Sequence, residues 1–230
     1  MSQYLLVSFK TCPWVQRAAI VLREKNVPFE FRHIEPDNRL DWFVAISPHK
    51  KVPVLRIDDT VSLFESNAIA EYLDETVAPR LHPDDPVARA VNRAWTDYVP
   101  TFSEGVTSCA YADTEADYAK AVEKIPLAFD RLERALEKQN AGPFFNGARY
   151  SLVDAAYAPF LQRYFFLDRI RPLGKIEKFP RLKAWAEALV ARPTTHSFPP
   201  AEFEAMYRAN VKRRDKWLSQ FVASAAVAAE

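Results

Sequence analysis

Cys12 is the residue whose type and position point most directly to chemistry. It lies between an apolar run, residues 4–9, and an amphipathic run that begins at Pro13. A thiol at such a junction is expected to cap a helix, where unpaired N–H groups and about half a positive charge favour an anion by roughly 0.3 to 1 kcal/mol. Cysteine pKa values in such places fall from about 8.5 toward roughly 3.5 to 7.5. The sequence therefore predicts a nucleophilic thiolate.

The residue three positions later is Val15 and not a second cysteine. A mixed disulfide at Cys12 would therefore need an outside thiol to resolve it. A structural role is the alternative, because free cysteine is often only a small buried apolar residue. The proline that follows also simply favours the first position of a helix. The motif alone leaves both interpretations open.

The composition excludes several classes of function. Of the 230 residues, 49% are hydrophobic and 27% charged, which is typical of a globular chain that can bury a core. The net charge of +1 provides no field that would attract nucleic acid or an acidic membrane. The four histidines are scattered without the spacing of metal ligands. We therefore expect no nucleic-acid partner, no membrane span and no metal.

Two further patterns indicate the compartment. The two cysteines, Cys12 and Cys109, are far apart, which fits a reducing compartment better than a disulfide scaffold. No basic leader followed by a long apolar stretch is present at the start, so we expect no secretory signal. The cytoplasm is the expected location.

Hydrophobic periodicity predicts the element order βαβαββα in the first third of the chain. The expected strands are residues 4–9, 29–34, 52–57 and 62–64. The expected helices begin at Pro13, span 41–46, and begin after Ser66, which is expected to act as the cap.

A proline-rich polar stretch then separates this part from a helical remainder. We predict a first domain at residues 1–77, a linker at 78–86 and an all-helical domain at 87–230. Within the helical part, Ser151 and Asp154 form a Ser-x-x-Asp pattern that predicts the start of a helix apolar on nearly every side.

Four motifs fall in the order and spacing of the glutathione transferase superfamily. They are Thr11-Cys12-Pro13-Trp14, residues 51–55 (Lys-Val-Pro-Val-Leu), residues 65–69 (Glu-Ser-Asn-Ala-Ile) and residues 72–75 (Tyr-Leu-Asp-Glu). With a cysteine in the catalytic position, the chain resembles the omega-like, cysteine-type branch most. The resemblance implies a thioredoxin-like first domain, glutathione as co-substrate, an acceptor pocket lined by the helical domain, and a homodimer.

The resemblance also implies a binding site for glutathione. A cis peptide at Val52-Pro53 would let Val52 offer its backbone to the cysteinyl part of the tripeptide, as a sheet edge accepts an added strand. From the residues alone, Pro53 is equally well explained as the start of a strand. Glu65 and Ser66 would receive the ammonium and carboxylate of the γ-glutamyl end, and Ser66 alone is explained as a helix cap.

Three more residues are assigned by resemblance. Arg39 or Lys51 would meet the glycine carboxylate, to which a planar guanidinium is suited, although a solvated lysine is the commoner outcome. Trp14 would line the ligand pocket, unless it packs in the core. The chain departs from many relatives at His49-Lys50, where glycine is frequent.

The implied activity is that of a glutathione-dependent thiol transferase acting through a Cys12–glutathione disulfide, with dehydroascorbate reduction and removal of glutathione from adducts as its reactions. One alternative is a glutathionyl-hydroquinone reductase, since Cys12-Pro13-Trp14 with Arg17 also resembles that group. The other is a scaffold of the same fold that binds or regulates without catalysis.

Overall fold

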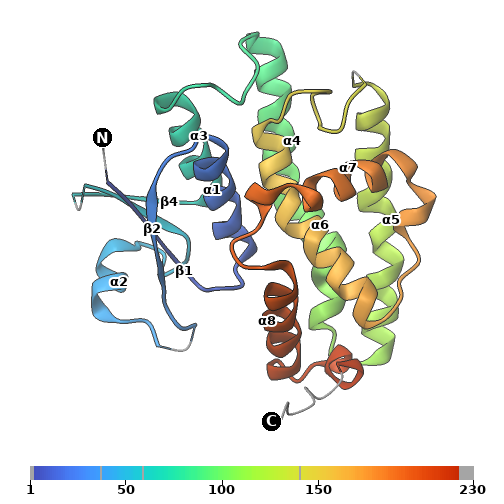
Figure 1. The fold of residues 1–230 in the computed structure, drawn as a ribbon. Helices are drawn as coiled ribbons and strands as arrows, with labels where there is room; N and C mark the ends of the chain where they lie inside the picture. Colours follow the sequence, from blue (N-terminus) through green and yellow to red (C-terminus); the bar gives the residue numbers. More distant parts are fainter. Residues whose placement is uncertain (1–2, 37, 59, 140, 223–230) are drawn as a thin grey trace. The chain divides into compact units, whose positions relative to one another are not determined.

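The computed structural model describes residues 3–36, 38–58, 60–139 and 141–222, and its first third alternates strands and helices (Figure 1). In chain order the elements are β1 (Tyr4–Ser8), α1 (Pro13–Glu24), β2 (Phe29–His33), α2 (Asp41–Ile46), β3 (Val54–Ile57), β4 (Val61–Phe64) and α3 (Ser66–Thr76). The predicted order βαβαββα is confirmed.

The rest of the chain contains long helices. They are α4 (Pro86–Thr107), α5 (Glu115–Glu137), α6 (Leu152–Ile170), α7 (Pro180–Ala191) and α8 (Pro200–Arg213), joined by loops and short 3₁₀ turns. The predicted fold class, a thioredoxin-like part followed by an all-helical part, is confirmed. Among the helices described, none has the length and apolar character needed to cross a membrane.

The four strands form one mixed sheet in the order β2-β1-β3-β4. β1 pairs with β2 in parallel and with β3 antiparallel, and β4 pairs antiparallel with β3. All five residues of β1 are buried because this strand has neighbours on both sides. A continuous apolar run such as Tyr4-Leu5-Leu6-Val7 is typical of a central strand covered on both faces.

Helices cover both faces of this sheet. Figure 1 shows α2 on one face and α1 with α3 on the other. Phe43 of α2 is buried with Leu5, Val7 and Val54 in one apolar cluster. On α1 the predicted apolar stripe, which includes Val15 and Leu22, is fully buried. The helix is therefore held in place by apolar contacts along its length.

The chain divides into two compact units whose residues interleave. One unit contains residues 1–99, 139–159 and 184–197, and the other contains residues 100–138, 160–183 and 198–230. The sheet and all the predicted site residues belong to the first unit. The domain boundaries expected from the sequence, with a linker at 78–86, stay a prediction.

Within the first unit, a buried carboxylate organises the start of α6. Asp154 accepts hydrogen bonds from the backbone N–H of Phe145 and of Ser151, each at 2.8 Å, and from the Ser151 hydroxyl at 2.7 Å. It also accepts one from the Trp185 indole at 2.7 Å. The capping pattern predicted for Ser151 and Asp154 is confirmed, and Trp185 is an additional donor supplied by α7.

Candidate active site

Three of the predicted motifs emerge at the same end of the sheet. Val7, near the end of β1, pairs with Val54 at the start of β3, and Val54 also pairs with Phe64 at the end of β4. Cys12 follows β1, and Ser66 follows β4. The chain therefore brings the cysteine motif, the segment before β3 and the start of α3 to one edge, where loops commonly bind ligands.

Cys12 is the N-cap of α1, as the sequence predicts. Its backbone is extended, with φ −72° and ψ 121°, and Pro13 is the first helical residue. The Cys12 carbonyl accepts the hydrogen bond of Gln16 N–H at 3.4 Å, and its own N–H donates to the Phe9 carbonyl at 3.2 Å. The sulfur is half-buried and makes no capping hydrogen bond, so the thiol is left available for chemistry.

Cys109 has a different environment. It is 1% exposed, and burial raises the pKa of its thiol to about 12. A thiol of that kind stays protonated at neutral pH and is unreactive. Cys12 is therefore the better candidate of the two for a nucleophile.

The segment that precedes β3 has the conformation expected of a peptide-binding edge. The Val52-Pro53 peptide bond is cis, which confirms the prediction. The expected strand begins two residues later than predicted, at Val54, because proline has no N–H for the ladder. Val52 lies outside the ladder and is half-buried. Its backbone N–H and C=O are thus not committed to strand pairing.

Arg39 lies against the loop that carries Lys51. Lys51 is exposed, and its backbone N–H and carbonyl are both bonded to the Ser47 hydroxyl, at 3.0 and 2.8 Å. The Arg39 guanidinium donates to the Lys50 carbonyl at 2.5 Å and lies 6.0 Å from the centre of the Phe9 ring. Two cations therefore lie at the edge that carries Cys12.

The loop at His49-Lys50, where the sequence departs from its relatives, has a backbone that explains why glycine is frequent there. Lys50 has a φ of 53°, in the left-handed region that glycine adopts without cost. The His49 ring packs on Phe64 with 5.3 Å between ring centres. The turn therefore holds a lysine with a positive φ, and the preceding residue, His49, is held by its ring contact with Phe64.

Glu65 and Ser66 lie where β4 ends and α3 begins. Glu65 is exposed, is the N-cap, and has a φ of 64°, a conformation that costs a non-glycine residue about 1–3 kcal/mol. Ser66 is the first helical residue and is 6% exposed, so the prediction that Ser66 itself caps the helix is wrong. The turn at Glu65 moves the cap one residue earlier, and the Ser66 N–H stays among the unpaired donors of the first turn.

A buried arginine, which is not among the predicted site residues, links the starts of α1 and α3. Arg17 is 2% exposed, and its guanidinium donates to the Asn67 side-chain oxygen at 3.1 Å and lies 5.9 Å from the Trp14 ring centre. Burial lowers the pKa of Arg17 to about 10. The Asn67 amide in turn donates to Asp97 at 3.0 Å. The sequence signal that could have identified Arg17 is a charged residue on the otherwise apolar face of α1.

Trp14 is half-buried beneath this guanidinium, so its ring faces a cation and not only core side chains. Three aromatic residues of the helical part, Phe102, Tyr164 and Trp185, are core residues of their units. Phe102 packs on Phe129, the Tyr164 hydroxyl accepts the Ile176 N–H, and Trp185 donates to Asp154. The structure gives these three a packing role.

Comparison with known proteins identifies the relatives of this chain. Residues 6–81 match the family model described as "Glutathione S-transferase, N-terminal domain", and residues 115–188 match "Glutathione S-transferase, C-terminal domain". Glutathione S-transferase omega-1 of Rattus norvegicus is 30% identical over 196 residues, which cover 85% of this chain and 80% of the relative. Glutathione S-transferase L1 of Arabidopsis thaliana is 33% identical over 190 residues, 80% of this chain and 76% of the relative.

A solved structure shows the same fold with a ligand. Rice GST1 in complex with glutathione superposes with a TM-score of 0.79 and 28% sequence identity, covering 92% of this chain and 97% of that one. The family match spans both parts of the chain, and omega-class proteins are among its relatives. This chain belongs to the glutathione S-transferase family.

Proposed function

We propose that this protein is a glutathione-dependent thiol transferase in which Cys12 is the nucleophile. The observation that carries the proposal is the half-buried Cys12 at the N-cap of α1, whose side chain makes no capping hydrogen bond. The residue at position 15 is a valine that is 2% exposed, so the motif contains no second thiol. The thiol that completes the cycle is therefore supplied by glutathione.

The residues at this edge fit the chemistry of the tripeptide. Its ammonium suits the exposed Glu65 carboxylate, and its γ-glutamyl carboxylate suits the unpaired N–H of Ser66. Its cysteinyl backbone suits Val52, which the sheet leaves outside the ladder. Its glycine carboxylate suits Arg39 or Lys51. Each charged end of the ligand therefore has a candidate partner: an oppositely charged side chain for the ammonium and for the glycine carboxylate, and a backbone N–H at a helix start for the γ-glutamyl carboxylate.

The cycle uses two sulfur exchanges. The Cys12 thiolate attacks the glutathione sulfur of a mixed disulfide, the S–S bond breaks, and the acceptor leaves as a thiolate that takes up a proton. A glutathione thiolate then attacks the glutathione sulfur of the Cys12–glutathione disulfide, and the S–S bond to Cys12 breaks. Oxidised glutathione leaves, and the Cys12 thiolate is restored. With dehydroascorbate the acceptor is reduced by two electrons, and two glutathione molecules become one disulfide.

The test compares two cysteine variants in a glutathione-coupled assay with a glutathionylated thiol and with dehydroascorbate. Cys12→Ala is expected to reduce turnover to the uncatalysed rate, because no other reachable thiol is available. Cys109→Ala is the matched control and is expected to retain full turnover, since Cys109 is buried. Full turnover by Cys12→Ala defeats the proposal.

A glutathionyl-hydroquinone reductase is a second candidate. The contact between Arg17 and Trp14 favours it, because these residues carry the resemblance to that group. The two candidates are ranked by measuring a glutathionyl-hydroquinone beside dehydroascorbate. A preference for the hydroquinone adduct keeps Cys12 as nucleophile and changes only the acceptor.

A scaffold without catalysis is the candidate from a different class. A pure scaffold has no need to keep Cys12, Val52 and Glu65 together at one edge. Retention on immobilised glutathione is the discriminating measurement. We expect retention of the wild type and its loss in Glu65→Ala; a wild-type protein that flows through unretained favours the scaffold.

Two further properties belong to the same proposal. We infer a twofold homodimer, as in the family, and light scattering on a size-exclusion column tests it. We also infer a reducing, cytoplasmic setting, since both cysteines of the chain are free.

A further inference from the structure

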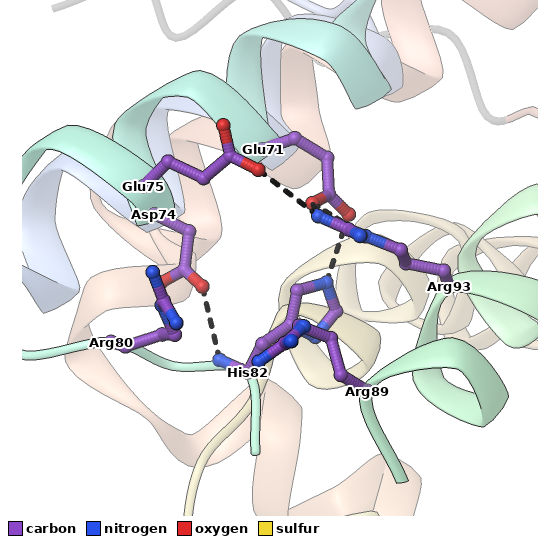
Figure 2. Close-up of a pocket in the computed structure, with 7 residues that line it drawn as sticks. All are labelled: Glu71, Asp74, Glu75, Arg80, His82, Arg89 and Arg93. Atoms are coloured by element: carbon purple, nitrogen blue, oxygen red, sulfur yellow. Dashed lines mark hydrogen bonds and ion pairs between the residues drawn. The ribbon is translucent and has the colours of Figure 1, made fainter. Parts of the chain in front are cut away.

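A pocket lies in the first unit, lined by residues of α3, of the segment 77–85 and of the first turns of α4 (Figure 2). It has a volume of about 340 Å³, at the lower end of the range for small-molecule sites. Four basic side chains line it: Arg80, His82, Arg89 and Arg93. None of them belongs to the edge that carries Cys12.

The carboxylates of this pocket already have cationic partners. Asp74 is 3% exposed, forms an ion pair with Lys25 at 3.0 Å, and accepts the backbone N–H of Leu81 and of His82 at 2.6 and 3.1 Å. This carboxylate therefore holds the segment that carries Arg80 in place and has little capacity left for a ligand.

The other two carboxylates are occupied by Arg93 and His82. Glu71 accepts from Arg93 at 2.7 Å and lies 2.8 Å from the His82 ring nitrogen Nε2, and Glu75 accepts from the same arginine at 3.1 Å. Burial alone would raise the pKa of Glu71, but the hydrogen bonds from His82 and Arg93 lower it below its usual value. The Glu71 carboxylate is therefore charged at neutral pH, and Glu71 and Glu75 share Arg93 as a cationic partner.

Among the residues that the structure describes, two of the guanidinium groups in this pocket have no carboxylate partner. Within that part, the Arg89 guanidinium donates to the backbone carbonyls of Pro83 and Asp84, at 3.2 and 3.1 Å. The Arg80 guanidinium makes no hydrogen bond or ion pair within the described part of the chain. The His82 ring is 1% exposed, and within the same part its Nδ1 has no hydrogen-bond partner. Guanidinium donors that line a pocket without a carboxylate partner indicate a site for an anionic ligand.

We propose that this pocket binds a phosphate group of a small molecule, held by Arg80 and Arg89. Each guanidinium presents parallel N–H donors that match two oxygens of a phosphate. A phosphate monoester carries about one and a half to two negative charges at neutral pH. Such a ligand would pair with the two guanidinium groups that have no carboxylate partner within the described part of the chain. The volume accommodates more than the phosphate itself, so the ligand is a phosphorylated metabolite or a diphosphate.

The test is calorimetric titration of the full-length protein with inorganic phosphate and with pyrophosphate, at constant ionic strength set with sodium chloride. Wild type is expected to bind pyrophosphate at one site per chain. Arg80→Gln is expected to bind it about tenfold more weakly or worse, because a charge-assisted hydrogen bond is lost. Arg134→Gln is the matched control: it removes the same charge from an exposed i,i+4 pair on α5, and its affinity is expected to equal that of wild type.

Arg89→Gln serves as a second variant, and its circular dichroism is recorded first because Arg89 also holds two loop carbonyls. If it is folded, it is expected to weaken pyrophosphate binding as Arg80→Gln does; if it is unfolded, Arg80→Gln alone decides. Cys12→Ala is expected to bind pyrophosphate like wild type, so failure of the anion site and failure of the proposed enzyme are distinguishable.

The proposal is overturned if wild type shows no saturable heat with either anion, or if Arg80→Gln binds as well as wild type. If neither anion binds and Arg80→Gln also lowers the mass measured by light scattering, the overturned proposal is replaced by another one, in which the arginines hold a second copy of the chain.

Discussion

At the scale of single residues, reactivity depends on where each cysteine lies. Cys12 ends a loop and begins a helix, whereas Cys109 is enclosed, and burial raises its pKa to about 12. The sequence predicted the position of Cys12 because the change from a strand pattern to a helix pattern is local. Nothing local distinguishes the burial of Cys109, which depends on residues that are distant in sequence.

Selective alkylation follows from this difference. Under native conditions at neutral pH, iodoacetamide is expected to label Cys12 and to leave Cys109 unlabelled, because a buried protonated thiol does not react. Peptide mass spectrometry after short labelling checks it, and labelling in denaturant provides the control in which both react. Equal labelling of the two cysteines in the native protein would refute the environments described above.

The site residues show what sequence can and cannot predict. Cys12 as a cap was predictable from the local change of pattern, whereas the cis bond before Pro53 was implied by the family resemblance and not by the residues alone. The cap at Glu65 was not, because a positive φ at glutamate is imposed by the junction of β4 with α3. The link from Arg17 to Asn67 spans 50 residues and appears only in the folded chain.

At the scale of elements, buried polar groups fix how helices begin. Asp154 accepts four hydrogen bonds, from the loop at Phe145, from the start of α6 and from α7. The Ser-x-x-Asp pattern predicted the local half of this network. The bond from Trp185 could not be predicted, since it joins residues 31 positions apart.

Asp154→Ala is therefore expected to lower the free energy of unfolding by about 3 kcal/mol or more, because it leaves several buried donors unpaired. Ser151→Ala removes one local bond and is expected to cost about 1 kcal/mol. Urea unfolding followed by circular dichroism compares the two. Equal small losses for both variants would mean that the contacts with Phe145 and Trp185 contribute nothing.

At the scale of the whole molecule, each compact unit contains a carboxylate whose pKa lies below its usual value. Glu71 in the first unit is held by His82 and Arg93, and Glu204 in the second by Arg169 and Arg208. Burial opposes the shift in both, and the hydrogen bonds reverse it. Arg208 is an i,i+4 neighbour of Glu204 on α8, which helical spacing can pair. The bonds from His82, Arg93 and Arg169 join different segments, which periodicity cannot pair because it reports which face is buried but not which neighbour covers it.

The stabilisation from Glu204 should therefore depend on pH. A carboxyl whose pKa is lowered by folding stabilises the protein above its unfolded value of 4.5, and this stabilisation is lost as the pH falls through the folded pKa. Glu204→Gln is expected to cost about 1 kcal/mol at neutral pH and almost nothing at about pH 3. Urea midpoints at the two pH values measure it, with the exposed Glu123→Gln as control. A cost that does not change with pH would argue against the ion pairs.

The central claim is that Cys12 forms a disulfide with glutathione, and intact-protein mass measurement after exposure to oxidised glutathione tests it most directly. Wild type and Cys109→Ala are expected to gain the mass of one glutathione, which a reductant removes, and Cys12→Ala is expected to gain none. A wild-type mass that stays unchanged, or an adduct that persists in Cys12→Ala, would contradict the account.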